Sequence, residues 1–255
     1  MTNTVNKVAL VTGGSRGLGK DMALQLAKKG FDVVITYQSQ SASAQEVVNQ
    51  IKSSGKKAHA LQLDVADAGS FDSFVSNLSA TLKNEFQTDT ITALVNNAGV
   101  GTHASLAETS LEQFDSMVNI HLKAPVFLTQ KLLPLLQDGS SVVNISSGLA
   151  RFSYNGYGVY AIMKAAIDSL TRYQALEFGA RKIRFNSVAP GAIATDFGGG
   201  AVRDNKDLND LIANSTALGR VGQPDDIGSV VAFLCSDDAK WINAQRIEVA
   251  GGVHI

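Results

Sequence analysis

Short runs of apolar residues alternate with longer amphipathic stretches along almost the whole chain. Strands are expected at residues 8–11, 33–36, 58–63, 91–95, 141–145, 183–188 and 246–249. Helices are expected between them, over 18–29, 44–52, 71–82, 111–136 and 157–178, with Pro125 and Pro134 as bends or breaks in the fourth. Strands that are apolar throughout and separated by helices indicate a parallel sheet covered on both faces. The sequence therefore predicts an α/β fold, a doubly wound parallel sheet of about seven strands, in a single domain over 1–255.

The amino-acid composition limits the kinds of partner that this chain can bind. The chain has 22 Lys and Arg against 23 Asp and Glu, so it lacks the basic excess of a nucleic-acid binder. Cys235 is the only cysteine, which excludes an internal disulfide and is typical of a reducing compartment. The first residues do not resemble a signal peptide, and apolar runs such as 230–235 are too short to span a bilayer. We expect a soluble, cytoplasmic protein that binds neither nucleic acid nor membrane.

Residues 12–19, Thr-Gly-Gly-Ser-Arg-Gly-Leu-Gly, lie between the first expected strand and the first helix. Gly13 allows a tight turn, while Gly17 and Gly19 let the backbone approach a pyrophosphate at the helix N-terminus. A glycine cluster alone is weak evidence, but in this position it is typical of a Rossmann-type dinucleotide site. The candidate cofactor-binding residues here are Gly13, Ser15, Arg16, Gly17, Leu18 and Gly19.

The end of the second strand bears on the choice of nucleotide. Proteins that bind NAD usually place an acidic residue there to hold the ribose 2′-hydroxyl. Tyr37, Gln38 and Ser39 stand there instead, and no acidic residue occurs from 33 to 45. Arg16 could pair with a 2′-phosphate, although it could also be a solvated loop residue. These features favour NADP(H) over NAD(H) and leave the use of both open.

Tyr160 and Lys164 are four residues apart at the start of an expected helix, so their side chains share one face. A nearby ammonium stabilises a phenolate and lowers the pKa of the phenol, which makes a better general acid near neutral pH. Ser147, at the end of the fifth strand, could hydrogen-bond a substrate oxygen. Each feature alone has a plain structural alternative, because such pairs are common on helices and serine often caps a turn.

Together these motifs resemble the short-chain dehydrogenase/reductase family over nearly the whole chain. The matching segments are residues 12–19, Asp64-Val65, Asn-Asn-Ala-Gly at 96–99, Ser147, Tyr160 to Lys164, Pro190-Gly191 and 247–252. The resemblance implies that Tyr160 is the general acid/base, that Lys164 holds the nicotinamide ribose and lowers the tyrosine pKa, and that Ser147 orients the carbonyl. It assigns Asp64 and Val65 to the adenine, Asn97, Ala98 and Gly99 to the cofactor cleft, and Pro190, Gly191, Ile193 and Thr195 to the carboxamide end. Family members are commonly tetramers paired through two long helices, so a homotetramer or homodimer is expected through 111–136 and 157–178.

One position departs from the family pattern. The family usually has an asparagine in the long helix, where it holds a water in a proton relay to the lysine, and here His121 aligns with it. His121 could replace the asparagine, since imidazole can donate, accept and pass protons. Alternatively, a local distortion of the helix could bring Asn119 into that role, or the relay could be absent. We favour the first interpretation.

The expected function is an NADPH-dependent carbonyl reductase, or an alcohol dehydrogenase in the reverse direction. The expected pocket residues, which favour an apolar or aromatic ketone, are Leu149, Phe152, Tyr154, Tyr157 and Phe197, with a lid over about 190–215 around Gly198 to Gly200. One alternative is a 3-oxoacyl-(acyl-carrier-protein) reductase, whose docking patch would use Lys131, Arg151, Arg172 and Arg181. A second is a non-catalytic NADPH-sensing regulator. The histidines at 59, 103, 121 and 254 are scattered, so no metal site is expected.

Overall fold

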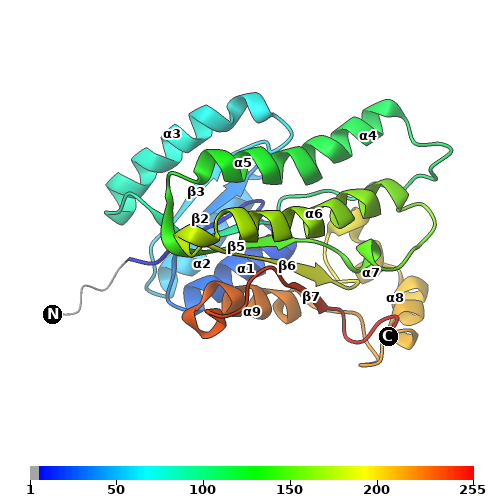
Figure 1. Ribbon diagram of the computed structural model, residues 1–255. Coiled ribbons are helices and arrows are strands. Elements are labelled where there is room, and N and C mark those ends of the chain that lie inside the picture. The colour runs from blue at the N-terminus through cyan, green and yellow to red at the C-terminus, as the bar shows by residue number, and fades with distance from the viewer. Residues whose placement is uncertain (1–5) are drawn as a thin grey trace.

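The computed structural model describes residues 6–255, and its centre is one parallel sheet with the strand order β3-β2-β1-β4-β5-β6-β7 (Figure 1). The strands of this described region are β1 Val8–Val11, β2 Asp32–Tyr37, β3 Ala58–Gln62, β4 Ile91–Asn96, β5 Leu136–Ile145, β6 Arg184–Pro190 and β7 Arg246–Val249. Each pairs with its neighbours in parallel register. The predicted doubly wound sheet is therefore confirmed.

Helices cover both faces of this sheet, as the apolar strands require (Figure 1). One face carries α1 Gly17–Lys28, α2 Ser41–Ser53 and α9 Pro224–Cys235, and the other carries α3 Phe71–Thr81, α5 Ala124–Leu132 and α6 Gly158–Glu177. Two apolar clusters result, one on each side of the sheet. Cys235 lies at the end of α9, where it is buried in the first cluster, and burial raises the pKa of its thiol to about 12.

The chain first adds strands outward on one side of β1 and then returns to add β4 to β7 on the other side. The order reverses between β1 and β4, so the loops that follow these strands diverge and leave a crevice at their carboxyl ends. In a doubly wound sheet this is the position where a nucleotide binds. The glycine loop follows β1, which places it at this edge.

The predicted helix over 111–136 is confirmed as one unbroken run of helical turns over 111–132, with a local change of helix type inside it. Helix α4 covers Leu111–Val118, a π-helical turn follows over Asn119–Lys123, and α5 ends at Leu132. Pro125 lies directly after the π-helical turn and has no N–H to donate to a carbonyl of that turn, so it stands at the distortion inside the longer helix. The helix ends at Leu132 rather than 136, because Pro134 disfavours a helical conformation in the residue before it. Leu136 is the first residue of β5. The other predicted helix and strand boundaries differ by at most three residues and match at both ends of β1 and β7, except that β5 starts five residues earlier, at Leu136 rather than 141.

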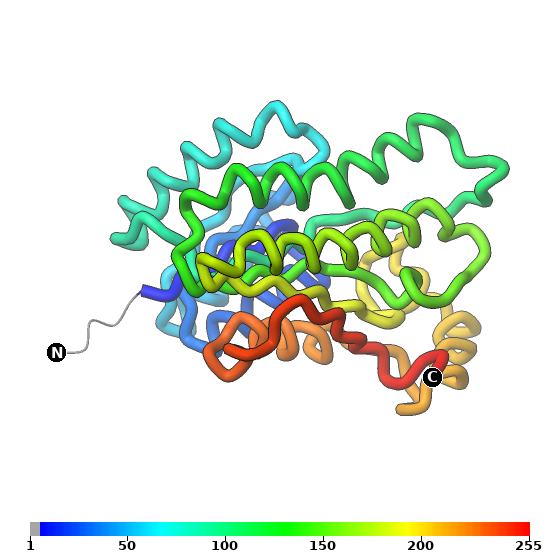
Figure 2. The backbone as a smooth tube through the Cα atoms, in the orientation of Figure 1, coloured from blue at the N-terminus to red at the C-terminus, as the bar shows by residue number. Residues whose placement is uncertain are grey.

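Helices α4 and α6 pack together and extend beyond the sheet (Figure 2). Beyond β6, the region expected to form a lid contains a turn at Phe197–Gly200 and two short helices, α7 Ala201–Asp204 and α8 Lys206–Asn214. Gly198, Gly199 and Gly200 all have positive φ angles, which other residues rarely adopt. Within residues 6–255, no helix has the length and apolar character needed to cross a membrane.

Candidate active site

The glycine loop is closed by contacts that leave no room for side chains. Gly13 has a φ of +66°, in the left-handed region. A Cβ atom on Gly19 would lie 2.1 Å from the Gly13 carbonyl oxygen, and one on Gly14 would lie 2.6 Å from the Cβ of Ile35. The loop can therefore hold its first helical turn against the end of β1 only because these positions are glycine. Such a loop presents backbone N–H groups to a phosphate.

Residues after β4 are bonded directly to this loop. The Thr12 hydroxyl accepts hydrogen bonds from the backbone N–H groups of Asn97 (2.9 Å) and Ala98 (3.0 Å). The Asn97 side-chain amide donates to the Thr12 carbonyl oxygen at 2.8 Å. Gly99 lies further along, packed against the ring of His121. The structure thus places the predicted Asn97, Ala98 and Gly99 along the same crevice as the glycine loop.

The residues predicted to contact the adenine end of the cofactor also lie close together. The Gln38 amide donates to the Asp64 carboxylate at 2.9 Å, and the backbone N–H of Ala66 donates to the other carboxylate oxygen at 2.9 Å. Asp64 is therefore fixed beside the end of β2, where Tyr37 and Ser39 flank Gln38 and Val65 follows Asp64.

The loop after β6 approaches the glycine loop from the opposite side. A Cβ on Gly17 would lie 3.7 Å from the Cβ of Thr195, and the exposed Arg16 guanidinium lies 3.7 Å from the Asp196 carboxylate. Gly17, Thr195 and Asp196 also border a cavity of about 300 Å³ between α1 and this loop. Earlier in the same loop, Pro190 ends β6, Gly191 packs against Ala250, and Ile193 forms a bridge with Gly222. The predicted carboxamide-side segment thus lies across the crevice from Gly17.

Ser147, Tyr160 and Lys164 come together as the sequence predicted, and all three are buried. The Lys164 ammonium donates to the Ile145 carbonyl oxygen at 2.7 Å and lies 5.4 Å from the centre of the Tyr160 ring. Burial raises the pKa of Tyr160 above its usual value, and a hydrogen bond with the Ser147 hydroxyl acts against that rise. Burial also lowers the pKa of Lys164 to about 8, with the Asp168 carboxylate acting in the opposite direction. The predicted lowering of the tyrosine pKa by Lys164 is thus opposed by burial.

His121 completes this cluster. The π-helical turn places it in the interior, where its ring meets the Tyr160 ring edge-on at 5.2 Å between centroids. Its Nε2 lies 2.7 Å from the Val100 carbonyl oxygen and 3.3 Å from the Val100 backbone nitrogen, and we assign the proton to Nε2 because the contact with the carbonyl oxygen is the shorter. The buried Nδ1 atom then has a free lone pair and no protein partner among residues 6–255. Burial, together with the Lys164 charge, lowers the pKa of His121 to about 3.

Comparison with known proteins agrees with this arrangement. A family model described as enoyl-(acyl carrier protein) reductase matches residues 13–254. The short-chain dehydrogenase/reductase FrzI of Cladobotryum sp is 36% identical over 98% of this chain and 96% of its own length. The chain belongs to the short-chain dehydrogenase/reductase family. It is therefore an NAD(P)-dependent oxidoreductase, and the resemblance found in its motifs is confirmed.

Two further members of the family are similar over nearly their whole length. The 3-oxoacyl-[acyl-carrier-protein] reductase FabG of Staphylococcus aureus is 35% identical over 98% of this chain and 99% of its own. The landomycin C-6 ketoreductase LanV, solved with bound NADP and rabelomycin, is 34% identical, with a TM-score of 0.88 and coverage of 98% of this chain and 97% of its own. The active-site cluster of this short-chain dehydrogenase/reductase thus lies in a fold shared with ketoreductases.

The predicted pocket residues of this short-chain dehydrogenase/reductase do not form one group. Phe197 lies 5.8 Å from the Tyr160 ring, centroid to centroid, and Leu149 packs against the same apolar cluster. Phe152 and Tyr154 gather instead around His254 near the C-terminus, and Tyr157 stacks edge-on against His103. Of the five, Phe197 therefore lies beside the Tyr160 ring and Leu149 packs against the apolar cluster that contains Tyr160.

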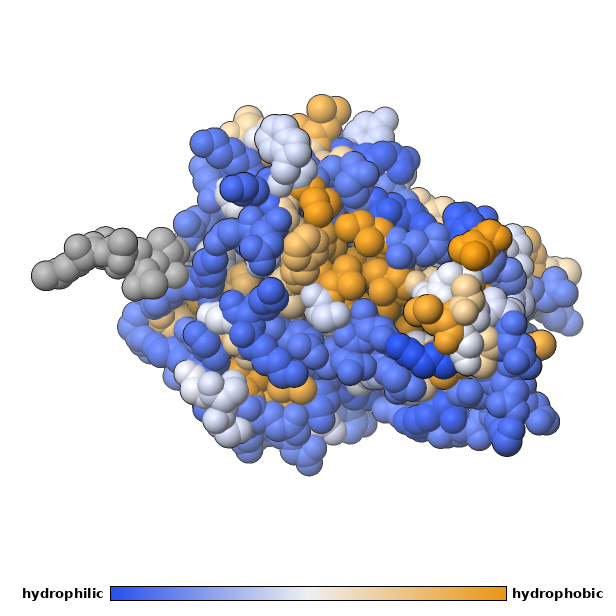
Figure 3. Space-filling model, turned by 90° about the horizontal axis from the view of Figure 1, so that it is seen from below, coloured by the Kyte–Doolittle hydropathy of each residue, from blue (hydrophilic) through white to orange (hydrophobic). Residues whose placement is uncertain are grey.

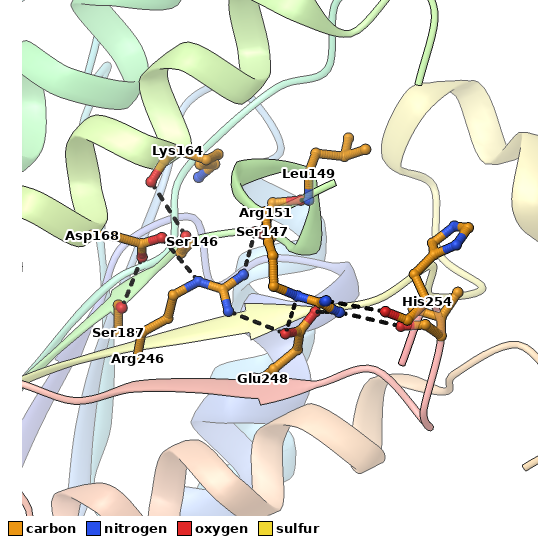
Figure 4. Close-up of polar contacts among 11 residues, drawn as sticks. Ser146, Ser147, Leu149, Arg151, Lys164, Asp168, Ser187, Arg246, Glu248 and His254 are labelled. Atoms are coloured by element: carbon orange, nitrogen blue, oxygen red, sulfur yellow. Dashed lines mark hydrogen bonds and ion pairs between the residues drawn. The ribbon is translucent and has the colours of Figure 1, made fainter. Parts of the chain in front are cut away.

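Sequence reasoning missed a polar network beneath Ser147 (Figure 4). It joins Asp168 of α6, Arg246 and Glu248 of β7, and Arg151 of the turn after β5, so it spans three separate segments of the chain. One signal was available, because Asp168 follows Lys164 by one helical turn and shares its face. Among residues 6–255, no group of three His, Cys, Asp or Glu side chains is arranged to hold a metal ion.

Proposed function

We propose that this protein is a carbonyl reductase in which Tyr160 protonates the oxygen of a ketone or aldehyde. The observation that carries the proposal is the convergence of Ser147, Tyr160 and Lys164 in one buried cluster. Tyr160 is protonated at neutral pH, and the Lys164 ammonium, 5.4 Å from the ring centre, stabilises the phenolate that forms when the proton is given up, which offsets part of the rise in pKa caused by burial. Alcohol oxidation is the same step in reverse.

The cofactor is NADP(H), which supplies the hydride when it is bound. The glycine loop fits a pyrophosphate, because only glycines, at whose positions a Cβ would collide with neighbouring atoms, let the first turn of α1 approach the end of β1 so that its N–H groups face the crevice. Arg16 is available to a 2′-phosphate because its contact with Asp196, at 3.7 Å between exposed groups, is weak. The protein LanV was solved with NADP, which agrees with this choice. Lys164, whose ammonium already reaches the end of β5, would hold the nicotinamide ribose.

His121 takes the place of the family asparagine in this proposal. Its Nε2–H is engaged by Val100, so its contribution is the free acceptor Nδ1. A water held there would extend a hydrogen-bonded path from Lys164, whose charge is close enough to lower the His121 pKa. With Nε2–H tied to a backbone carbonyl, the ring serves as a hydrogen-bond acceptor rather than as a group that passes a proton through.

An apolar or aromatic ketone is the proposed substrate class. Phe197 and Leu149 supply apolar surface next to Tyr160, and LanV is a ketoreductase that was solved with rabelomycin. We propose that the segment over about 190–215, which carries Phe197, closes over such a substrate as a lid. The three consecutive glycines at 198–200 give this segment unusual backbone freedom.

A 3-oxoacyl-(acyl-carrier-protein) reductase remains the second candidate, because FabG is 35% identical. The structure weakens the basic docking patch that this function needs. Lys131, Arg151 and Arg181 lie within 2.7–2.9 Å of the carboxylates of Asp72, Glu248 and Asp138 respectively. Three of the four expected docking cations are thus partly neutralised.

The deciding experiment follows loss of NADPH absorbance with aryl ketones, β-keto esters and a 3-oxoacyl carrier protein, with NADH in parallel. We expect turnover of aryl ketones with NADPH, and a loss of about 10²- to 10⁴-fold in kcat in Tyr160→Phe, since that is the usual contribution of a general acid. Preference for the acyl carrier protein would favour the second candidate. NADPH binding without any turnover would favour the sensing regulator and contradict the proposal.

We further propose that the protein is a homotetramer or homodimer paired through α4 and α6. The four large apolar side chains Leu111, Ile162, Tyr173 and Leu176 of these helices are more than half exposed. Exposed apolar surface of this kind marks an interaction site. A second apolar area lies on the face that carries α9, bordered by hydrophilic residues, and could supply the other contact of a tetramer (Figure 3).

A further inference from the structure

Arg246, on the edge strand β7, contacts both of the segments that carry the catalytic groups. Its Nη2 donates to the Ser147 carbonyl oxygen at 3.0 Å, and its Nε donates to the Asp168 carboxylate at 2.9 Å (Figure 4). Asp168 lies on α6, the helix of Tyr160 and Lys164. One guanidinium therefore joins the Ser147 turn to the helix of the other two catalytic residues.

The partners of Arg246 are themselves held in place. Asp168 accepts a further hydrogen bond from the Ser187 hydroxyl of β6 at 2.9 Å. Glu248 accepts from Arg246 at 3.2 Å and from Arg151 at 2.9 and 3.2 Å. Burial would raise the pKa of Glu248, but its bonds with Arg151 and Arg246 bring it below the usual value. Two cations and two anions thus balance in a partly buried network, where charge-assisted hydrogen bonds are strong.

Ser147 itself makes few other hydrogen bonds, while the preceding Ser146 hydroxyl donates to the Lys164 carbonyl oxygen of α6 at 3.3 Å. Ser147 is extended, with φ −160° and ψ 152°, and its hydroxyl accepts from the Leu149 backbone N–H at 3.2 Å. Its carbonyl oxygen accepts from the Ala150 backbone N–H at 3.1 Å as well as from Arg246. The bonds from the Leu149 and Ala150 amides are local and close the turn on itself. The bond from Arg246 ties that turn to the sheet edge and, through Asp168, to α6.

We propose that Arg246 is a positioning residue, which holds the Ser147 turn against α6 so that the Ser147 hydroxyl and the Tyr160 phenol face one carbonyl oxygen. This inference rests on the proposed reductase function for its kinetic consequence. Arginine suits the role because its planar fork donates in several fixed directions at once, whereas lysine has a single ammonium and cannot span the same acceptors.

The kinetic test compares Arg246→Ala, Arg246→Lys and the control Arg151→Ala, which removes the bonds of the turn to Glu248, Val253 and His254 but leaves the bond between Arg246 and the Ser147 carbonyl oxygen intact. Misplacement of a reacting group by about 1 Å can reduce the rate by about 100-fold, so we expect kcat of Arg246→Ala to fall by about 10- to 100-fold.

The Kd for NADPH should stay within about twofold, because Arg246 contacts none of the glycine loop. Added guanidinium should restore part of kcat in Arg246→Ala and none in Arg246→Lys, and Arg151→Ala should keep a kcat near that of the wild type. Equal losses in Arg246→Ala and Arg151→Ala, or no loss in either, would overturn the proposal.

A second readout does not depend on turnover. Hydrogen exchange of the Leu149 and Ala150 amides reports on the Ser147 turn, because both donate to Ser147. We expect faster exchange of these amides in Arg246→Ala and wild-type exchange in Arg151→Ala. Unchanged exchange in Arg246→Ala would show that the turn holds itself and would overturn the positioning role. If the wild type reduces no carbonyl, the proposed function fails while this measurement still decides whether Arg246 positions Ser147.

Discussion

At the scale of single residues, His121 has the environment that most separates this chain from the family pattern. An asparagine at this position has no charge at any pH, whereas histidine must remain neutral here against a usual pKa of 6.5. Its interior position, beside Lys164, lowers the pKa to about 3. The substitution therefore has one consequence for catalysis and another for stability.

For catalysis, we expect His121→Asn to keep most of its activity, because the amide oxygen can replace Nδ1 as acceptor. His121→Ala should lower kcat by about tenfold, which corresponds to the loss of one hydrogen bond of about 1.4 kcal/mol. Steady-state rates at saturating NADPH measure this difference. If the alanine variant is as fast as the wild type, His121 has no part in the reaction.

For stability, the free energy of unfolding of the wild type should fall as the pH drops from about 6.5 towards 3. In that range the unfolded chain binds a proton at residue 121 that the folded protein excludes, so acid favours unfolding by up to about 1.4 kcal/mol per pH unit. His121→Asn removes this term, so urea unfolding at several pH values should show the asparagine variant losing less stability in acid. Parallel curves for the two proteins would contradict the assigned environment.

At the scale of elements, the close contact of α1 with the end of β1 depends on Gly19. In Gly19→Ala the new methyl group would overlap the Gly13 carbonyl oxygen, so α1 must move away from the loop. We expect a loss of about 1–3 kcal/mol in stability and clearly weaker NADPH binding, measured by urea unfolding and by titration of cofactor fluorescence.

The control for this prediction is Gly179→Ala. Gly179 has open space around its Cα and no positive φ angle. This variant should match the wild type in both measurements. Normal NADPH binding by Gly19→Ala would mean that the loop does not hold the pyrophosphate as proposed.

The elements also show how far the sequence could predict the structure. Strands β1, β2 and β4 are apolar on both faces, so the sequence identifies them as buried strands with no competing interpretation. A local distortion of the helix near His121 could be named as an alternative, but its form as a π-helical turn at 119–123 could not be predicted, because wider turns leave no separate pattern of apolar residues. The contact of Arg246 with Ser147 joins residues far apart in the chain, and only the strand order brings them together.

At the scale of the whole molecule, the open question is how many copies associate. We expect light scattering to give two or four chain masses in solution. Leu176→Glu should reduce this number, because Leu176 is 79% exposed on α6 and a charge there would be costly in a packed interface. Leu211→Glu, on the exposed face of α8, is the matched control and should leave the mass unchanged. A monomeric wild type would rule out the proposed pairing.

The Cys235 thiol can report on the separation of α9 from the sheet. It is the only thiol in the chain, it is buried at the end of α9, and its raised pKa leaves almost no thiolate at neutral pH. A thiol reagent can therefore react at a useful rate only after α9 has separated from the sheet. The labelling rate of a single site then measures the fraction of molecules that open, without any added dye or tag. Every variant considered above retains this cysteine, so the labelling rate of the same thiol can be used to compare their stabilities.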